Sequence, residues 1–132
     1  MNYTRVESLI SEWDDVYKKG QLSLWVLLAI YDGKKFAAEI QEFLYAATDE
    51  AFEVKEQSLY RALRRFKSMG LVKVSEEESP NGGPKRKVYS LTDEGILLLS
   101  RFIDLHISPL FKPDITNLLR RAKKEGETYE KV

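Results

Sequence analysis

Basic side chains are concentrated between residues 55 and 67, where they alternate with apolar ones. Five basic residues from Lys55 to Lys67 accompany a single acid, Glu56, and the run from residue 58 to 72 reads SLYRALRRFKSMGLV. Lysine and arginine neutralise phosphate groups, and arginine also donates paired hydrogen bonds to guanine edges. The residue types in this run therefore indicate binding of nucleic acid.

A helix would place the apolar and the basic residues of this run on opposite sides. Leu59, Leu63 and Phe66 recur at the 3.6-residue period, and Gly70 is a typical residue just beyond a helix end. We predict a helix from about Lys55 to Met69 whose outer side meets phosphates and base edges. Its expected DNA contacts are Lys55, Gln57, Ser58, Tyr60, Arg61, Arg64 and Arg65.

An ordinary solvent-exposed helix is the alternative explanation of such a charge run. In a helix of that kind, basic residues usually have acidic partners one turn away, whereas this run offers only Glu56. The residues that follow the helix favour the DNA-binding interpretation.

A second basic cluster lies in a predicted β-hairpin after the helix. The segments LVKVSEEE and KRKVYSL have the composition of strands, and they flank SPNGGP, whose proline and glycines favour a turn. Lys85, Arg86 and Lys87 then lie at the tip of the hairpin. There we expect them to contact flanking phosphates or the minor groove.

Two further helices are predicted before the basic one. Residues 22–31 are apolar almost all round, which indicates a central core helix, and residues 36–47 carry Ile40, Phe43 and Leu44 at inward-facing positions. The order helix, helix, basic helix, glycine and basic hairpin is that of a winged helix-turn-helix. The predicted fold class is therefore mainly α with a small β-hairpin.

Both ends of the chain are expected to form amphipathic helices outside this domain. Residues 4–18 form an amino-terminal arm helix, which Lys18, Lys19 and Gly20 are expected to end. At the other end, Thr92 followed by two acids starts a helix that Pro109 and Pro113 break. A last helical segment covers residues 115–124, before a charged, frayed tail. The predicted organisation is an arm (1–19), a winged domain (20–92) and carboxy-terminal dimerisation helices (93–132).

The terminal helices carry more apolar surface than a small winged domain can cover, which predicts a homodimer. The expected interface residues are Leu9, Trp13, Leu98, Leu99, Phe102, Ile103 and Leu105.

Charge is distributed unevenly along a chain with no formal net charge. The 132 residues contain 21 basic and 21 acidic side chains; residues 1–54 carry 5 basic and 10 acidic ones, and residues 55–87 carry 9 and 4. Overall neutrality argues against unspecific coating of nucleic acid. A basic middle segment is what a groove-docking module requires.

Several other classes of protein are disfavoured by composition. The chain has no cysteine and one histidine, His106, so a thiolate metal site or a catalytic triad lacks its parts. We expect no enzyme activity, no metal and no cofactor. The longest apolar run, Leu24–Ile30, is too short to cross a bilayer, and no signal-peptide pattern precedes it. We therefore expect a cytoplasmic protein that does not bind membranes.

Two long runs in this sequence resemble the PadR-like transcriptional regulators. These runs are SLYRALRRFKSMGLV and SPNGGPKRKVYSLTDEGILLL, and the likeness covers about Gly20 to Phe102. The resemblance implies a cytoplasmic, dimeric DNA-binding regulator, typically a repressor, whose last helix makes much of the dimer. It also implies that Tyr60 and the wing basics contact DNA, and that Tyr89, Leu91 and Thr92 pack the wing onto the next helix.

The chain departs from the family pattern at two places. Family members usually carry Gly-Tyr-Glu-Ile where this chain reads Ala37-Ala38-Glu39-Ile40, and some drug-responsive relatives have a tryptophan on the last helix. Here both tryptophans, Trp13 and Trp25, come before the basic helix. They could line a cavity for a small-molecule effector, although a tryptophan on an apolar helix face is more often core packing.

Two functions therefore stand after the sequence alone. The first is a dimeric repressor that binds a double-stranded DNA operator and responds to a small molecule or another signal. The alternative is a winged-helix module whose basic face binds an acidic protein partner.

Overall fold

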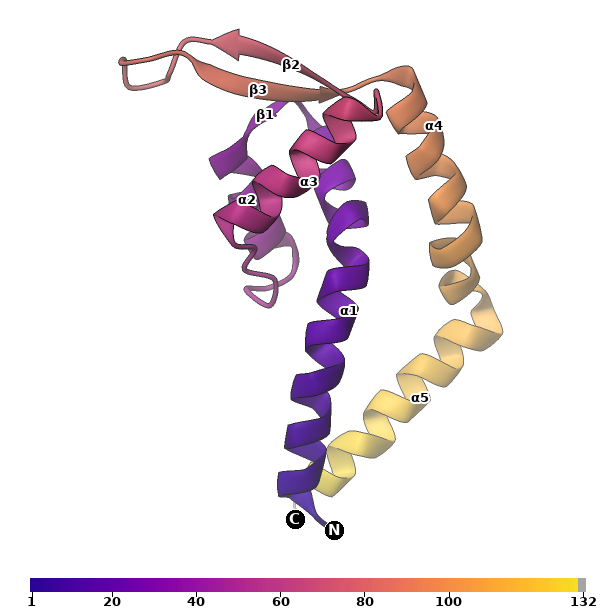
Figure 1. The fold of residues 1–132 in the computed structure, drawn as a ribbon. Helices are drawn as coiled ribbons and strands as arrows, with labels where there is room; N and C mark the ends of the chain where they lie inside the picture. The colour runs from indigo at the N-terminus through magenta and orange to yellow at the C-terminus, as the bar shows by residue number, and fades with distance from the viewer. Residues whose placement is uncertain (131–132) are drawn as a thin grey trace. The chain divides into compact units, whose positions relative to one another are not determined.

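The computed structural model describes residues 1–130 of the chain, which divides into two compact units between residues 96 and 97. The first unit contains α1 (Tyr3–Asp32), β1 (Lys35–Phe36), α2 (Ala37–Ala47), α3 (Glu56–Ser68), β2 (Val72–Glu77) and β3 (Arg86–Leu91). Helix α4 (Asp93–Phe102) begins in it and continues into the second unit, which also holds α5 (Pro113–Glu130) (Figure 1). This mainly helical fold with a small antiparallel sheet confirms the predicted fold class.

Helix α1 is continuous from Tyr3 to Asp32, so the predicted helix end at Lys18–Gly20 is wrong. A basic pair before a glycine resembles a helix end, but Gly20 lacks the left-handed backbone that such an end uses. A glycine inside a helix costs only about 1 kcal/mol. Burial of apolar residues that follow it, among them Leu24, Val26 and Leu27, outweighs that cost.

The core of the first unit is formed by α1, α2, α3 and the sheet. Its most completely buried large side chains are Val26 from α1, Ile40 and Leu44 from α2, and Leu59 and Leu63 from α3. Helix α3 ends where Gly70 takes a positive φ of 75°, and the amide of Leu71 donates to the carbonyl of Phe66 at 2.9 Å. Both the extent of α3 and its apolar face are as predicted.

The sheet has three antiparallel strands in the order β1, β3, β2. Strands β2 and β3 form the predicted hairpin, called the wing below, and its turn contains Gly82 and Gly83 at φ of 80° and 89°. Figure 1 shows the wing lying across the end of α3. Strand β1 was not predicted. Its two residues, Lys35 and Phe36, pair with Tyr89 and Val88 of β3, and a strand of that length leaves no period in a sequence.

The start of α4 is held against the segment that follows α3. The hydroxyl of Thr92 accepts from the amide of Gly95 at 3.1 Å and donates to the carbonyl of Gly70 at 2.6 Å. The amide of Thr92 also donates to the carbonyl of Leu71 at 3.1 Å. Thr92 therefore caps α4, as predicted.

The second unit differs in detail from the predicted helices. Helix α4 ends at Phe102, and a π-helical turn (Ile103–Ile107) and a 3-10 turn (Ser108–Phe111) follow, so Leu105 lies outside α4. Pro109 lies in the 3-10 turn, while Pro113 starts α5, where its fixed φ suits a first helical position. Helix α5 runs to Glu130, beyond the predicted end at residue 124. The predicted fraying is therefore wrong for residues 125–130, and residues 131 and 132 lie outside the described residues.

None of the helices within residues 1–130 combines the length and the apolar character needed to cross a membrane.

Candidate nucleic-acid interface

The two sides of α3 differ sharply in burial. Leu59, Ala62, Leu63 and Phe66 are all less than 4% exposed, and between them the helix turns its polar residues outward. Gln57, Arg61 and Arg64 are exposed, while Ser58 and Tyr60 are half-buried beside them. We call Gln57, Tyr60, Arg61 and Arg64 the outer face of α3.

The outer face of α3 is concave at its start. Glu56 and the four outer-face residues line a hollow of about 370 Å³, called the α3 hollow below. Two guanidinium groups at one hollow supply the donors that phosphates and guanine edges accept.

A second hollow connects α3 with strand β3 of the wing. It has a volume of about 340 Å³, and we call it the wing-base hollow. Its lining residues are Phe36, Ala37, Ala38, Tyr60, Arg86, Lys87 and Tyr89. Tyr60 lines both hollows, so the structure brings the basic helix and two of the three predicted wing basics to adjoining surfaces.

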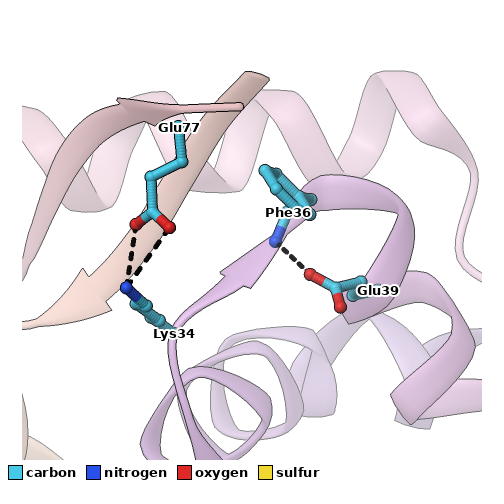
Figure 2. A network of polar contacts seen from close by, with 4 residues as sticks. All are labelled: Lys34, Phe36, Glu39 and Glu77. Atoms are coloured by element: carbon cyan, nitrogen blue, oxygen red, sulfur yellow. Dashed lines mark hydrogen bonds and ion pairs between the residues drawn. The ribbon is translucent and has the colours of Figure 1, made fainter. Parts of the chain in front are cut away.

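The wing is tied to the segment around β1 near the end of its strands that adjoins the turn, where Arg86 and Lys87 begin β3. The guanidinium of Arg86 lies over the ring of Phe36 at 5.4 Å, within the range of a cation–π contact. On the other strand, Glu77 forms an ion pair with Lys34 at 3.0 Å, as Figure 2 shows. Lys87 lines the wing-base hollow, while Lys85 is exposed in the turn.

The basic residues of the interface have no acidic partners among residues 1–130. The ion pairs in this range join Lys18 with Asp14, Lys34 with Glu77 and Lys35 with Asp32, and none of them involves α3 or residues 85–87. The charge of the interface is therefore available to an external anion.

The predicted contacts at the edges of α3 are placed differently. Lys55 is exposed at the position just before α3, where its carbonyl accepts from the amide of Leu59. Arg65 donates to the hydroxyl of Ser23 in α1 at 3.4 Å and lies over the ring of Phe66 at 5.5 Å. The structure thus directs the guanidinium of Arg65 toward α1, and Arg65 does not line the α3 hollow.

Reasoning from the sequence assigned Tyr89 only to packing and did not single out Phe36 or Ala37 as site residues. Tyr89 is 6% exposed, and burial raises the pKa of its phenol; the nearby Tyr60 raises this pKa further and Arg64 lowers it. The phenol of Tyr89 therefore lies within electrostatic reach of two outer-face residues. The sequence did offer one indication that Tyr89 belongs to the site: it lies on the predicted strand that also carries Lys85, Arg86 and Lys87.

The predicted dimer residues have unequal exposure in the single chain. Leu9, Trp13, Leu98 and Leu105 are exposed, Phe102 and Ile103 are half-buried, and Leu99 is buried at 4%. Leu99 therefore offers little surface to a partner. His106 stacks on Phe102 with their ring centroids 4.8 Å apart, and residues 1–130 contain no cluster of acidic or histidine side chains able to hold a metal.

The comparisons with known proteins agree with this geometry. An uncharacterized protein of Lysinibacillus sphaericus is 27% identical over 85 residues, which cover 64% of this chain and 77% of the relative. A crystal structure of a PadR-like transcriptional regulator from Bacillus cereus is 29% identical with a TM-score of 0.62, covering 76% of this chain and 93% of that one.

A more distant likeness involves a DNA complex. Bacillus subtilis PadR, crystallised in complex with operator DNA, is 18% identical with a TM-score of 0.56 and matches 62% of this chain and 46% of its own length. At that identity the likeness is one of fold. The model of the PadR-like family of transcriptional regulators matches residues 26–101, more than half of the chain. This protein belongs to the PadR-like family of transcriptional regulators.

Proposed function

We propose that this protein is a homodimeric, sequence-specific DNA-binding repressor that acts in the cytoplasm and responds to a small molecule or another signal. The observation that carries the proposal is the outer face of α3, where Arg61 and Arg64 are exposed, lack acidic partners within residues 1–130 and adjoin the basic wing. A face of this shape and charge suits a major groove. The fold likeness to a protein crystallised on operator DNA supports the same assignment.

An anisotropy titration at two salt concentrations tests DNA binding. The probes are a fluorescent duplex from the protein's own promoter and a random duplex of equal length. We expect the promoter duplex to bind at least about 10³-fold more tightly, and both affinities to fall steeply with salt. Absence of duplex binding at moderate salt would favour the alternative, an acidic protein partner. Repression itself is tested by a promoter reporter, whose expression should rise when the protein is removed.

The dimer proposal rests on uncovered apolar side chains in both units. On α1, Ile10, Trp13 and Tyr17 are each more than half exposed, and in the second unit Leu105 and Phe111 are about 70% exposed. Apolar surface on this scale usually marks an interface between chains.

The first prediction concerns oligomeric state. Light scattering of the intact protein at micromolar concentration should give about twice the 15.3 kDa mass of one chain. Replacing Leu98 and Leu105 with glutamate should produce monomers, because both side chains are exposed in the single chain and would be buried in the dimer. Replacing Tyr31 and Met69, two exposed apolar residues of the winged domain that were not assigned to the interface, provides the comparison. A monomeric mass for the unmodified protein would refute the dimer.

A response to an effector is supported by the hollow on the arm part of α1. Ile10, Ser11, Trp13, Asp14 and Tyr17 line about 420 Å³ there. Two exposed aromatic rings beside a carboxylate suit a planar, cationic molecule. Trp13 is 71% exposed, so binding there should quench or shift its fluorescence.

A second prediction concerns the wing. Replacing Lys85 and Lys87 together with alanine should weaken promoter and random duplexes alike, because phosphate contacts carry no sequence information. The slope of log affinity against log salt should fall by about 0.9 for each phosphate that the variant no longer neutralises. Replacing Lys123 and Lys124 of α5 changes the net charge equally and should leave the slope unchanged. A selective loss on the promoter duplex would instead assign base readout to the wing.

A further inference from the structure

Tyr89 has a polar group without a partner in the wing-base hollow. The residue is 6% exposed, and its hydroxyl forms no hydrogen bond with any group in residues 1–130. Within residues 1–130, every side-chain oxygen that is fully buried has a hydrogen-bond partner. The hydroxyl of Tyr89 is therefore not fully buried, and Tyr89 lines the wing-base hollow. A hydroxyl in this position favours an external hydrogen-bond partner.

The start of α2 opens into the same hollow. Phe36, the residue before α2, has no side-chain acceptor for the first amides of the helix. Its own amide donates to the carboxylate of Glu39 at 2.8 Å (Figure 2). The amides of Ala37 and Ala38 thus remain free, and the small methyl side chains allow a ligand to approach them closely. Free amides at the start of a helix favour anions.

The charges around the hollow point to the same kind of ligand. Arg86 and Lys87 line it, and none of its lining residues is acidic. Arg64 lies close enough to influence the phenol of Tyr89 electrostatically. A phosphate group, with several acceptor oxygens and a negative charge, matches two hydroxyls, free amides and two cations.

We propose that the wing-base hollow binds one phosphodiester group of the DNA backbone in each protomer, with the hydroxyl of Tyr89 and the amides of Ala37 and Ala38 donating to its oxygens. Lys87 supplies the compensating charge. The inference rests on the proposed DNA binding. It favours a duplex phosphate over free phosphate because Tyr60 also lines the α3 hollow, so a duplex on the outer face of α3 passes the wing-base hollow.

The test compares two Tyr→Phe substitutions, each of which removes one hydroxyl and keeps the ring. Y89F should weaken promoter and random duplexes alike by about tenfold or more, since a hydrogen bond to a charged group is removed. The control is Y45F, because the hydroxyl of Tyr45 bonds Glu50 beyond the other end of α2. Y45F should bind like the unmodified protein. Both variants should keep the original melting temperature, which separates an effect on DNA binding from an effect on folding.

A second arm identifies the phosphate and its source. Neutral methylphosphonates are placed one at a time along the promoter duplex. At one position in each half-site the substitution should weaken the unmodified protein more than it weakens Y89F, because Y89F already lacks one of the groups that bind this phosphate. If the effects of Y89F and the methylphosphonate add at every position, Tyr89 contacts no backbone phosphate and the inference is wrong. Inorganic phosphate that shifts the Ala38 amide in NMR spectra as fully as duplex does would assign the hollow to free phosphate and also overturn it.

The two proposals fail in different ways. If the protein binds promoter and random duplex equally and Y89F weakens both, the phosphate site stands and sequence-specific repression does not. If the protein prefers its promoter and Y89F binds equally well, only the phosphate site is refuted. Absence of any duplex binding refutes both.

Discussion

Replacing Arg64 with alanine is expected to weaken operator binding by about 1–3 kcal/mol at each half-site, with little change on random duplex. The guanidinium of Arg64 is exposed, lines the α3 hollow beside Gln57 and Tyr60, and has no acidic partner within residues 1–130. It is therefore placed to reach a guanine edge. A dimer presents the substitution twice, so the total loss should approach double the value for one site.

The adjacent Arg65 provides the matched control for Arg64. Both substitutions remove one charge from α3, but Arg65 is engaged with Ser23 and Phe66. R65A should therefore reduce affinity only slightly and equally on both duplexes. Anisotropy titrations of the two variants on promoter and random duplexes make the comparison. Equal losses of affinity from R64A on the two duplexes would show that the helix only clamps phosphates.

Replacing Gly95 with alanine is expected to lower the free energy of unfolding by about 3 kcal/mol. A Cβ atom at Gly95 would clash with the carbonyl oxygen of Leu71 and lie 3.2 Å from the carbonyl carbon, both backbone atoms. Backbone here cannot move aside freely, because the same carbonyl accepts from the amide of Thr92. In a unit of this size, the melting temperature should fall by more than about 10 °C.

Gly20→Ala is the matched control for Gly95→Ala. Gly20 lies inside α1, and a Cβ atom there would meet nothing within 4 Å. Alanine should therefore raise the free energy of unfolding by about 1 kcal/mol, as in an ordinary helix interior. Thermal or urea unfolding of both variants measures the two changes in the free energy of unfolding. A destabilising G20A would mean that α1 is broken near residue 20, and a neutral G95A would mean that the start of α4 is loosely held.

The outer face of α3 could be predicted because the spacing of apolar residues along one helix is a local property of the sequence. The spacing of Leu59, Leu63 and Phe66 identifies the buried side of α3, and the remaining positions must then face outward. Gly70 and Thr92 indicated the end of α3 and the start of α4 through the same short-range rules.

The predictions of secondary structure failed where contacts with distant segments outweigh the local conformational preference of the chain. The sequence Lys-Lys-Gly resembles a helix end, but core packing after residue 20 keeps α1 helical. Strand β1 exists only because β3 offers an edge to Lys35 and Phe36. Arg64 and Arg65 are the same residue type on the same helix, and the contact of Arg65 with Ser23 on α1 is one that no local pattern indicates.

The sequence by itself determined the class of this protein, since helical period, turn residues and uneven charge are properties of short segments. It identified the basic face of α3 and the basic wing, and the family model confirms the class that they indicate. Only the tertiary structure decided which groups meet at the wing-base hollow. That hollow joins residues 36–38, 60, 86, 87 and 89, and Tyr89 lines it although the residue is only 6% exposed. Such a site depends on contacts between residues some 50 positions apart, which no local pattern encodes.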